Sequence, residues 1–207
     1  MASADRPTRP STTTRRTLIA GGAALCGLML THSGRALATS SEAVALIEAL
    51  RDGGHIVYFR HAATTWSGID SVTWPRDQQR QLSERGIDDS VAIGSAFARH
   101  EIPVGDILAS PFARTSDMAM LAFGRVEEQM ALIGLLSDDG GQPERVAHLT
   151  TLLSTPPATG TNRIIISHRS NIQTVAGVRL EEGEAVVVAP LGDGGFRVLG
   201  TLMPADW

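Results

Sequence analysis

The sequence predicts an α/β protein, a three-layer α/β/α sandwich whose sheet is mostly parallel and has an antiparallel end. Short, continuously apolar segments alternate with segments of helical periodicity, as expected for strands buried under helices on both faces. Near the C-terminus, two apolar runs flank residues 192–195, Gly-Asp-Gly-Gly, which favours a terminal hairpin. The chain has 207 residues, 43% hydrophobic and 19% charged, which suits one globular domain.

The first half of the chain contains the expected elements in alternation. Ser41 and Glu42 open an apolar-periodic run that stops at Gly53-Gly54, which predicts a capped helix, and a buried strand follows at residues 55–59. A second helix is expected between Leu82 and His100, with four apolar residues on one broad face: Ile87, Val91, Ile93 and Phe97. Gly94 weakens this helix without ending it.

The second half continues the same pattern. We expect strands at residues 107–109 and 164–166, and helices at about 112–123, 143–153 and 171–176. The apolar runs 186–188 and 196–199 would form the terminal hairpin.

Composition excludes several classes of function. All eighteen basic residues are Arg, so Schiff-base chemistry and a lysine-dependent phosphate loop are excluded, and Arg must bind any anion. With 22 acidic residues the net charge is −4, and no Arg cluster is dense enough to predict nucleic acid as a partner. A single Cys, Cys26, permits neither an internal disulfide nor a multi-Cys zinc site.

Residues 1–38 have the anatomy of an export signal. Arg15-Arg16 precedes a largely apolar run from Leu18 to Leu30, and Ala36-Leu37-Ala38 offers a cleavage site after Ala38. The run would span roughly 20 Å as a helix, short of the roughly 30 Å hydrocarbon thickness, so we expect no permanent membrane span.

The segment Thr14-Arg15-Arg16-Thr17-Leu18-Ile19 resembles a twin-arginine export signal. This predicts transient contact with export machinery and a periplasmic or extracellular domain at residues 39–207. The alternative is a basic N-terminal arm that stays attached.

Polar groups follow the ends of three predicted strands. They are Arg60-His61, the segment from Ser110 to Arg114, and Ser167-His168. In open α/β sheets ligands bind beyond the carboxyl ends of the strands, so imidazoles and guanidiniums would converge there if these strands are neighbours. Helix N-termini behind Ser110 and His168 would add amide donors, and the result is a predicted phosphate pocket.

These residues carry a resemblance to the histidine phosphatase superfamily, which is related to the phosphoglycerate mutases. Residues 60–66, Arg-His-Ala-Ala-Thr-Thr-Trp, resemble its RHG-x-T-x-W signature, and residues 82–86, Leu-Ser-Glu-Arg-Gly, its L-[ST]-x-x-G helix start. Residues 110–115, Ser-Pro-Phe-Ala-Arg-Thr, resemble its S-P-x-x-R-[AT] segment, and residues 167–171, Ser-His-Arg-Ser-Asn, its S-H-G-x-N segment. The motifs occur in the family order, three of them at predicted strand ends.

The resemblance implies a two-step hydrolysis of a phosphomonoester without a metal or another cofactor. His61 would attack phosphorus, and water would then cleave the phosphohistidine. Arg60, Arg114 and His168 would hold the phosphoryl oxygens and stabilise the charge that develops in the transition state. The substrate would be a small phosphomonoester or a phosphorylated polymer.

Two positions depart from the family motifs. Ala62 and Arg169 replace glycines of the signatures. Arg169 could reach the pocket or point to solvent, and solvent is favoured because most arginines are exposed. Trp66 and Ser67, on the loop after His61, are expected to line the substrate entrance.

The proton donor for the leaving group is not fixed by any motif. Family phosphatases often carry an acid some two dozen residues after the second Arg, a window that here contains Asp138 and Asp139. Glu127 and Glu128 lie earlier, on a probable strand, and Asp138-Asp139 before two glycines can equally be a simple turn.

Two rival functions use the same site. A phosphoglycerate mutase-like phosphotransferase would need a captured bisphosphate, and the compact chain and export signal argue against it. A non-catalytic module for phosphorylated ligands would not need an intact set of His61, His168, Arg60 and Arg114.

Overall fold

The computed structural model describes residues 40–137 and 140–207. The predicted export signal and the acids Asp138 and Asp139 therefore lie outside the described residues. The elements, with η for short 3₁₀ helices, are α1 (Ser40–Arg51), β1 (Ile56–Arg60), η1 (Arg76–Gln78), α2 (Glu84–Arg99), β2 (Val104–Ala109), α3 (Ala113–Phe123), β3 (Glu127–Glu128), η2 (Met130–Leu132), α4 (Gln142–Ser154), β4 (Asn162–Ser167), α5 (Arg169–Ala176), β5 (Ala185–Pro190), η3 (Gly192–Gly194), β6 (Phe196–Leu202) and η4 (Pro204–Asp206).

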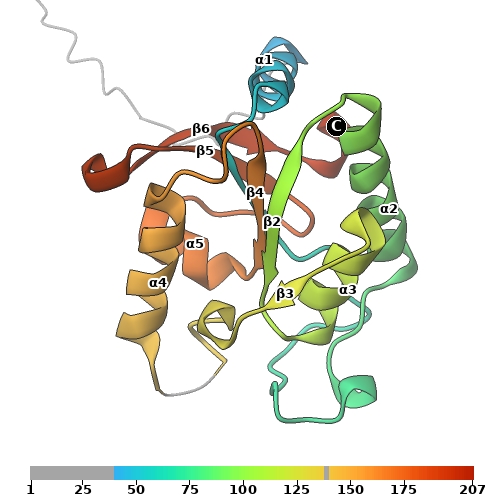
Figure 1. The fold of residues 1–207 in the computed structure, drawn as a ribbon. Coiled ribbons are helices and arrows are strands. Elements are labelled where there is room, and N and C mark those ends of the chain that lie inside the picture. Colours follow the sequence, from blue (N-terminus) through green and yellow to red (C-terminus); the bar gives the residue numbers. More distant parts are fainter. Residues whose placement is uncertain (1–39, 138–139) are drawn as a thin grey trace, which may run out of the picture. The chain divides into compact units, whose positions relative to one another are not determined.

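The strands form one sheet in the order β3-β2-β4-β1-β5-β6. The pairs β3–β2, β2–β4 and β4–β1 are parallel, whereas β5 is antiparallel to both β1 and β6. In Figure 1, α2 and α3 lie on one side of the sheet, and α4 and α5 lie on the other. The predicted three-layer sandwich with an antiparallel end is confirmed.

Alternate strand residues feed two separate hydrophobic cores. Val57 and Phe59 of β1 pack with residues of α1, α2 and α3, whereas Ile56 and Tyr58 pack with residues of α4 and α5. All four side chains have no exposed surface. Burial on both faces explains why the strands appear in the sequence as continuous apolar runs.

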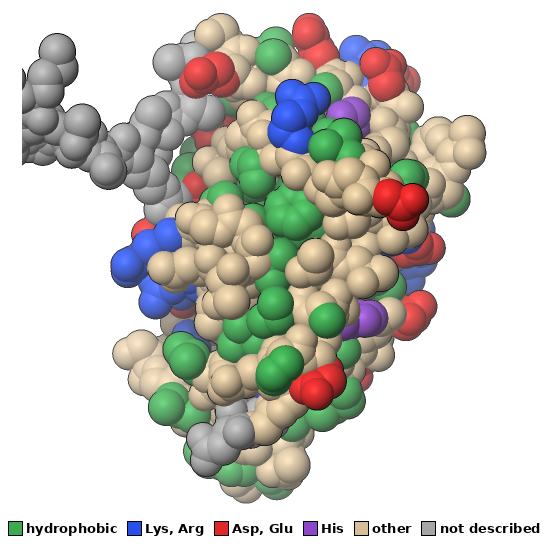
Figure 2. Space-filling view, turned by 90° about the vertical axis from the view of Figure 1, so that its left-hand side faces the viewer, with side chains coloured by type: hydrophobic (Ala, Val, Ile, Leu, Met, Phe, Trp, Pro, Cys, Tyr) green, Lys and Arg blue, Asp and Glu red, His purple; other side chains and the backbone are tan. Residues whose placement is uncertain are grey.

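On the side of the domain where α4 lies, apolar and charged side chains occupy separate parts of the surface. Figure 2 shows hydrophobic side chains exposed along the middle of this view and charged ones mostly nearer its margins.

No helix among residues 40–137 and 140–207 is both long and apolar enough to cross a bilayer.

The buried face of α2 differs from the predicted one. Ile93 and Phe97 are buried, but Ile87 and Val91 are 42% and 47% exposed. Gly86 and Ser90 take the buried positions instead, and at Gly86 the helix approaches the backbone of Ala63 too closely for any side chain. The expectation that all four apolar residues share the core face was wrong.

Gly94 lies where α2 crosses α3. A Cβ atom at this position would come within 2.1 Å of the backbone oxygen of Ala122. The contact is with backbone, so relief would require the two helices to move apart.

Gly94→Ala is therefore expected to lower the free energy of unfolding by about 1–3 kcal/mol, as overpacking does. At an exposed helical site the same change would instead stabilise by up to about 1 kcal/mol. Urea denaturation gives the sign, with Ser95→Ala, at an exposed position of the same helix, as the control. A Gly94→Ala protein more stable than the parent would contradict the close packing of α2 on α3.

Candidate active site

The sheet brings the three predicted polar strand ends to one edge. The strands β2, β4 and β1 are neighbours, and backbone hydrogen bonds continue past their ends. The amide of His61 donates to the carbonyl of Ser167 at 3.0 Å, and the amide of Ser110 donates to the carbonyl of Ile166 at 3.1 Å. His61, Ser110 and His168 therefore follow adjacent strands at the same edge.

The loop after His61 is fixed by the start of α2. The amide of Ser83 donates to the carbonyl of Ala63 at 2.9 Å, and the Ser83 hydroxyl caps the helix by accepting from the amide of Gly86 at 3.2 Å. A Cβ atom on Gly86 would come within 2.1 Å of the Ala63 oxygen. The L-[ST]-x-x-G motif thus holds the backbone just beyond His61.

His61 is a buried imidazole whose tautomer is set by its backbone. Its Nδ1 lies 2.9 Å from the carbonyl oxygen of Ala62, which can only accept, so Nδ1 carries the proton. In the neutral ring the lone pair is then on Nε2. The side chain is 3% exposed and lines a cavity, and its ring centroid lies 5.8 Å from that of His168.

His168 is the N-cap residue of α5 and is held on three sides. A guanidinium nitrogen of Arg114 donates to its Nδ1 at 3.4 Å, so the proton is on Nε2, which donates to the hydroxyl of Ser110 at 2.9 Å. The buried hydroxyl of Tyr58 donates to its carbonyl at 2.8 Å. Arg114 and Ser110 thus orient the ring of His168, and Tyr58 anchors its backbone.

Both imidazoles are kept neutral. Burial, followed by the positive charge of Arg114, lowers the pKa of each ring well below its usual value. His61 is therefore an uncharged base with a free lone pair at neutral pH.

Arg114, in the first turn of α3, is buried beside an acid that sequence reasoning did not identify. One of its terminal nitrogens donates to both carboxylate oxygens of Asp70, at 3.0 and 2.8 Å. Burial, opposed by this carboxylate, lowers the pKa of Arg114 to about 10, so it stays charged at neutral pH. Its Nε is buried and has no hydrogen-bond partner among the described residues.

Arg60 and Arg80 share a second acid, Glu182. A terminal nitrogen of Arg60 donates to its carboxylate at 3.1 Å, and a terminal nitrogen of Arg80 lies 3.5 Å from the same oxygen. Burial is the main cause of a lowered Arg60 pKa, which Glu182 opposes. Arg80 also donates to the hydroxyl of Thr64 at 2.6 Å and the carbonyl of Trp66 at 3.0 Å, which fastens the loop after His61.

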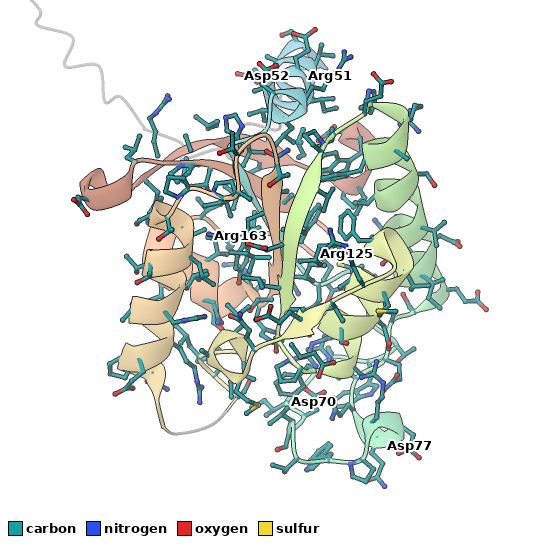
Figure 3. All side chains as sticks on the ribbon, in the orientation of Figure 1. Arg51, Asp52, Asp70, Asp77, Arg125 and Arg163 are labelled. Atoms are coloured by element: carbon teal, nitrogen blue, oxygen red, sulfur yellow. The ribbon has the colours of Figure 1, made fainter. Side chains whose placement is uncertain are left out.

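A cavity of about 420 Å³ connects these groups. Its lining includes the predicted residues Arg60, His61, Ser67, Arg114 and His168. Asp70, which also lines it, lies below the carboxyl ends of the strands in Figure 3, at the opposite end of the domain from Arg51 and Asp52. The described lining also contains Gly68, Ile69, Arg80, Gly134, Leu136, Ser137, Arg169, Ser170, Gln173 and Glu182.

Two expectations about pocket residues were wrong. Trp66 does not line the cavity; it is 40% exposed, and the guanidinium of Arg80 lies 5.9 Å from its ring centre, so the indole packs on a cation instead. Arg169, expected to point to solvent, is half-buried in the cavity wall because it is the first residue of α5, next to His168.

The candidate proton donors separate into two groups. Glu127 and Glu128 form β3, away from the cavity lining, and Glu128 accepts a hydrogen bond from the hydroxyl of Ser116 at 2.6 Å. Asp138 and Asp139 lie outside the described residues, directly after Ser137, which lines the cavity.

Sequence reasoning missed Asp70, Arg80 and Glu182. Asp70 and Arg80 are in the loop between Gly68 and Gln81, and Glu182 is in the turn before β5, where no periodicity indicates which way a side chain points. The one signal in the sequence that could have found the two acids was charge, because buried arginines require acidic partners.

The described residues contain no group of three or more His, Cys, Asp or Glu side chains placed to hold a metal ion. The arginines and imidazoles of the cavity instead form a site suited to a tetrahedral anion.

Solved structures with the same fold include phosphatases. The protein histidine phosphatase SixA, solved with tungstate, aligns with a TM-score of 0.57 and 14% identity, covering 73% of this chain and 98% of that one. The described domain has the histidine phosphatase fold. A mutant phosphoserine phosphatase from Entamoeba histolytica, solved with phosphoserine, aligns with a TM-score of 0.52 and 12% identity, covering 73% of this chain and 98% of that one. No protein-family model and no curated protein matches the sequence.

The buried neutral imidazoles predict how stability depends on pH. Below about pH 6.5 the unfolded chain binds protons that the folded His61 and His168 do not, so unfolding becomes easier as the pH falls towards their lowered pKa values. Each imidazole contributes up to about 1.4 kcal/mol per pH unit in this window. In urea denaturation from pH 7.5 to pH 5, His61→Asn should therefore lose stability less steeply than the parent. Equal slopes would show that His61 is not held neutral.

Proposed function

We propose that the chain is a phosphomonoester hydrolase that works through a phosphohistidine on His61. The observation that carries this proposal is a buried imidazole with its lone pair on Nε2, in a cavity lined by Arg60, Arg114 and His168. The shared fold with phosphatases supports it.

In the first step, Nε2 of His61 attacks phosphorus, the bond from phosphorus to the ester oxygen breaks, and this oxygen takes a proton from the donor proposed below and leaves as the alcohol. The hydrogen bond from Nδ1 to the carbonyl of Ala62 stabilises the positive charge that the ring gains. In the second step, water attacks the phosphohistidine and gives one proton back to that donor, the P–N bond breaks with its electron pair returning to Nε2, and inorganic phosphate is released. The overall reaction consumes one water and needs no redox partner.

The guanidiniums bind the phosphoryl oxygens. Arg114 lines the cavity and is held by Asp70, so its charge is fixed next to the anion. Arg60 is tied to Glu182 at 3.1 Å and presents a permanent charge. His168 contributes a further donor when its Nε2–H turns from Ser110 to the anion. The fixed charges of the guanidiniums stabilise the transition state because they need little reorganisation.

Replacing the nucleophile tests the proposal directly. His61→Ala is expected to abolish turnover of p-nitrophenyl phosphate while leaving the circular dichroism spectrum and the fold intact. His100→Ala, at the end of α2 and away from the cavity, is the matched control and should keep the parental rate. Turnover of His61→Ala within about tenfold of the parent, a barrier change of only about 1.4 kcal/mol, would contradict the assignment.

Two rival functions give different results in the same experiments. A binding module would retain phosphate without turning over any ester. A mutase would transfer the phosphoryl group between substrate positions and depend on added bisphosphate, so product analysis with and without bisphosphate distinguishes it from a hydrolase.

For the leaving-group proton we propose Asp138, with Asp139 as the alternative, because they follow Ser137 of the cavity wall. Asp138→Asn or Asp139→Asn should slow alkyl phosphates far more than p-nitrophenyl phosphate, whose leaving group hardly needs a proton. Glu128→Gln is the control, since Glu128 is off the cavity lining, and should leave the ratio of the two rates unchanged. Equal slowing of both esters would implicate binding, and no slowing would assign the proton to water.

We also propose that the domain is exported through the twin-arginine signal, with cleavage near Ala38. Replacing Arg15 and Arg16 together by Lys should leave the precursor in the cytoplasm. Replacing Arg6 and Arg9 by Lys, upstream of the pair, is the control and should leave export unchanged. Processed protein outside the cytoplasm at the parental level in the first variant would reject the signal.

A further inference from the structure

The cavity has an apolar rim that the phosphoryl chemistry does not need. Ile69 and Leu136 are 78% and 77% exposed, more than any other large hydrophobic side chain in the described residues, where the next is Met130 at 58%. Both line the same cavity as His61. Single exposed apolar residues are ordinary, but the two most exposed ones at one cavity mouth indicate a surface that a ligand covers.

Backbone contacts fix both rim residues relative to the site. Ile69 precedes Asp70, whose carboxylate accepts from Arg114 and from the amide of Arg80 at 2.9 Å. Leu136 follows Leu135, whose amide donates to the side chains of Ser170 and Asn171, both at 3.2 Å. The neighbours of both apolar residues are thus anchored, and Ile69 and Leu136 come from two different segments of the cavity lining.

The excess positive charge of the cavity lining matches the negative charge of one phosphoryl group. Its described lining carries Arg60, Arg80, Arg114 and Arg169 against Asp70 and Glu182, an excess of two positive charges. A phosphomonoester group carries a charge of about −1.5 to −2 near neutral pH.

Arg169 supplies the part of this excess that no acid among the described residues offsets. It makes no hydrogen bond or ion pair with another described residue, and its charge acts on the neighbouring Arg60 by lowering the Arg60 pKa. The like charges of Arg60 and Arg169 favour an anion bound between them. Once a phosphoryl group is bound, no arginine of the described lining is left to bind a second acidic group.

We propose that the site selects phosphomonoesters of uncharged, apolar alcohols, with the leaving group seated between Ile69 and Leu136. Arg169 then contributes to binding the phosphoryl group and not to binding a carboxylate or a second phosphate. This specificity rests on the proposed hydrolase function. The other uncharged side chains of the lining, such as Ser67 and Gln173, add hydrogen-bonding capacity but no charge.

The test is kcat/KM for ethyl, butyl and hexyl phosphate, whose leaving groups have similar basicity. It should rise about twofold to fourfold per added methylene, the upper value matching about 0.8 kcal/mol for a fully buried methylene. Glycerol 1-phosphate should fall below butyl phosphate, and 3-phosphoglycerate below ethyl phosphate. A flat series, or a preference for the carboxylate-bearing ester, would overturn the inference.

Surface variants locate the effect. Ile69→Asn and Leu136→Asn, each at a position more than three-quarters exposed, should fold normally and reduce the increase per methylene, and the double variant should abolish it. Leu191→Asn, at an exposed leucine between β5 and β6, is the control and should keep the parental series. A parental series in the double variant would reject the apolar rim.

Failure of this specificity and failure of the proposed function are distinguishable. Alkyl phosphonates of the same chain lengths are not hydrolysed, so their affinity, measured by calorimetry, reports the rim without chemistry. Hydrolysis of every ester with flat affinities would reject the rim alone. If the affinities rise with chain length but no ester is hydrolysed, the apolar rim is supported and the hydrolase function is rejected.

Discussion

The parallel pairing of β1, β4 and β2 is the constraint on which the site depends. These strands are far apart in the chain, yet their register places Arg60-His61, His168 and Ser110 at adjacent strand ends. The constraint arises from burial, because strands covered on both faces must be apolar until they leave the sheet. Polar chemistry can therefore begin only where the strands end, and all of it begins at the same edge.

The second determinant is the balance between burial and charge. Burial makes a proton on His61 or His168 unfavourable and so lowers the pKa of each ring, and the nearby charge of Arg114 adds to the effect. The arginines in turn are tolerated because Asp70 and Glu182 offset part of their charge. The same arrangement that gives a neutral imidazole thus leaves a surplus of positive charge for an anion.

The parts of the site that could be predicted from the sequence are those tied to regular structure. His61 and His168 lie just beyond the ends of apolar strands, so the strand pattern and the motifs at the strand ends located them. The Asp70–Arg114 pair depends on how an irregular loop folds back on α3, and Trp66 stacks on Arg80 for the same reason. Arg169 was placed in solvent on the average behaviour of arginine, but its position beside the N-cap His168 brings it to the cavity. The exposed face of α2 was missed because close backbone contacts at Gly86 outweigh the apolar pattern.

The central claim is that Nε2 of His61 carries the phosphoryl group during turnover. Rapid quenching with a ³²P-labelled phosphomonoester, followed by mass spectrometry of the peptides, tests it most directly. The account predicts an acid-labile, base-stable label on His61, attached at Nε2 because Nδ1 is engaged with the carbonyl of Ala62. Turnover without a labelled peptide, or a label on any residue other than His61, would contradict it.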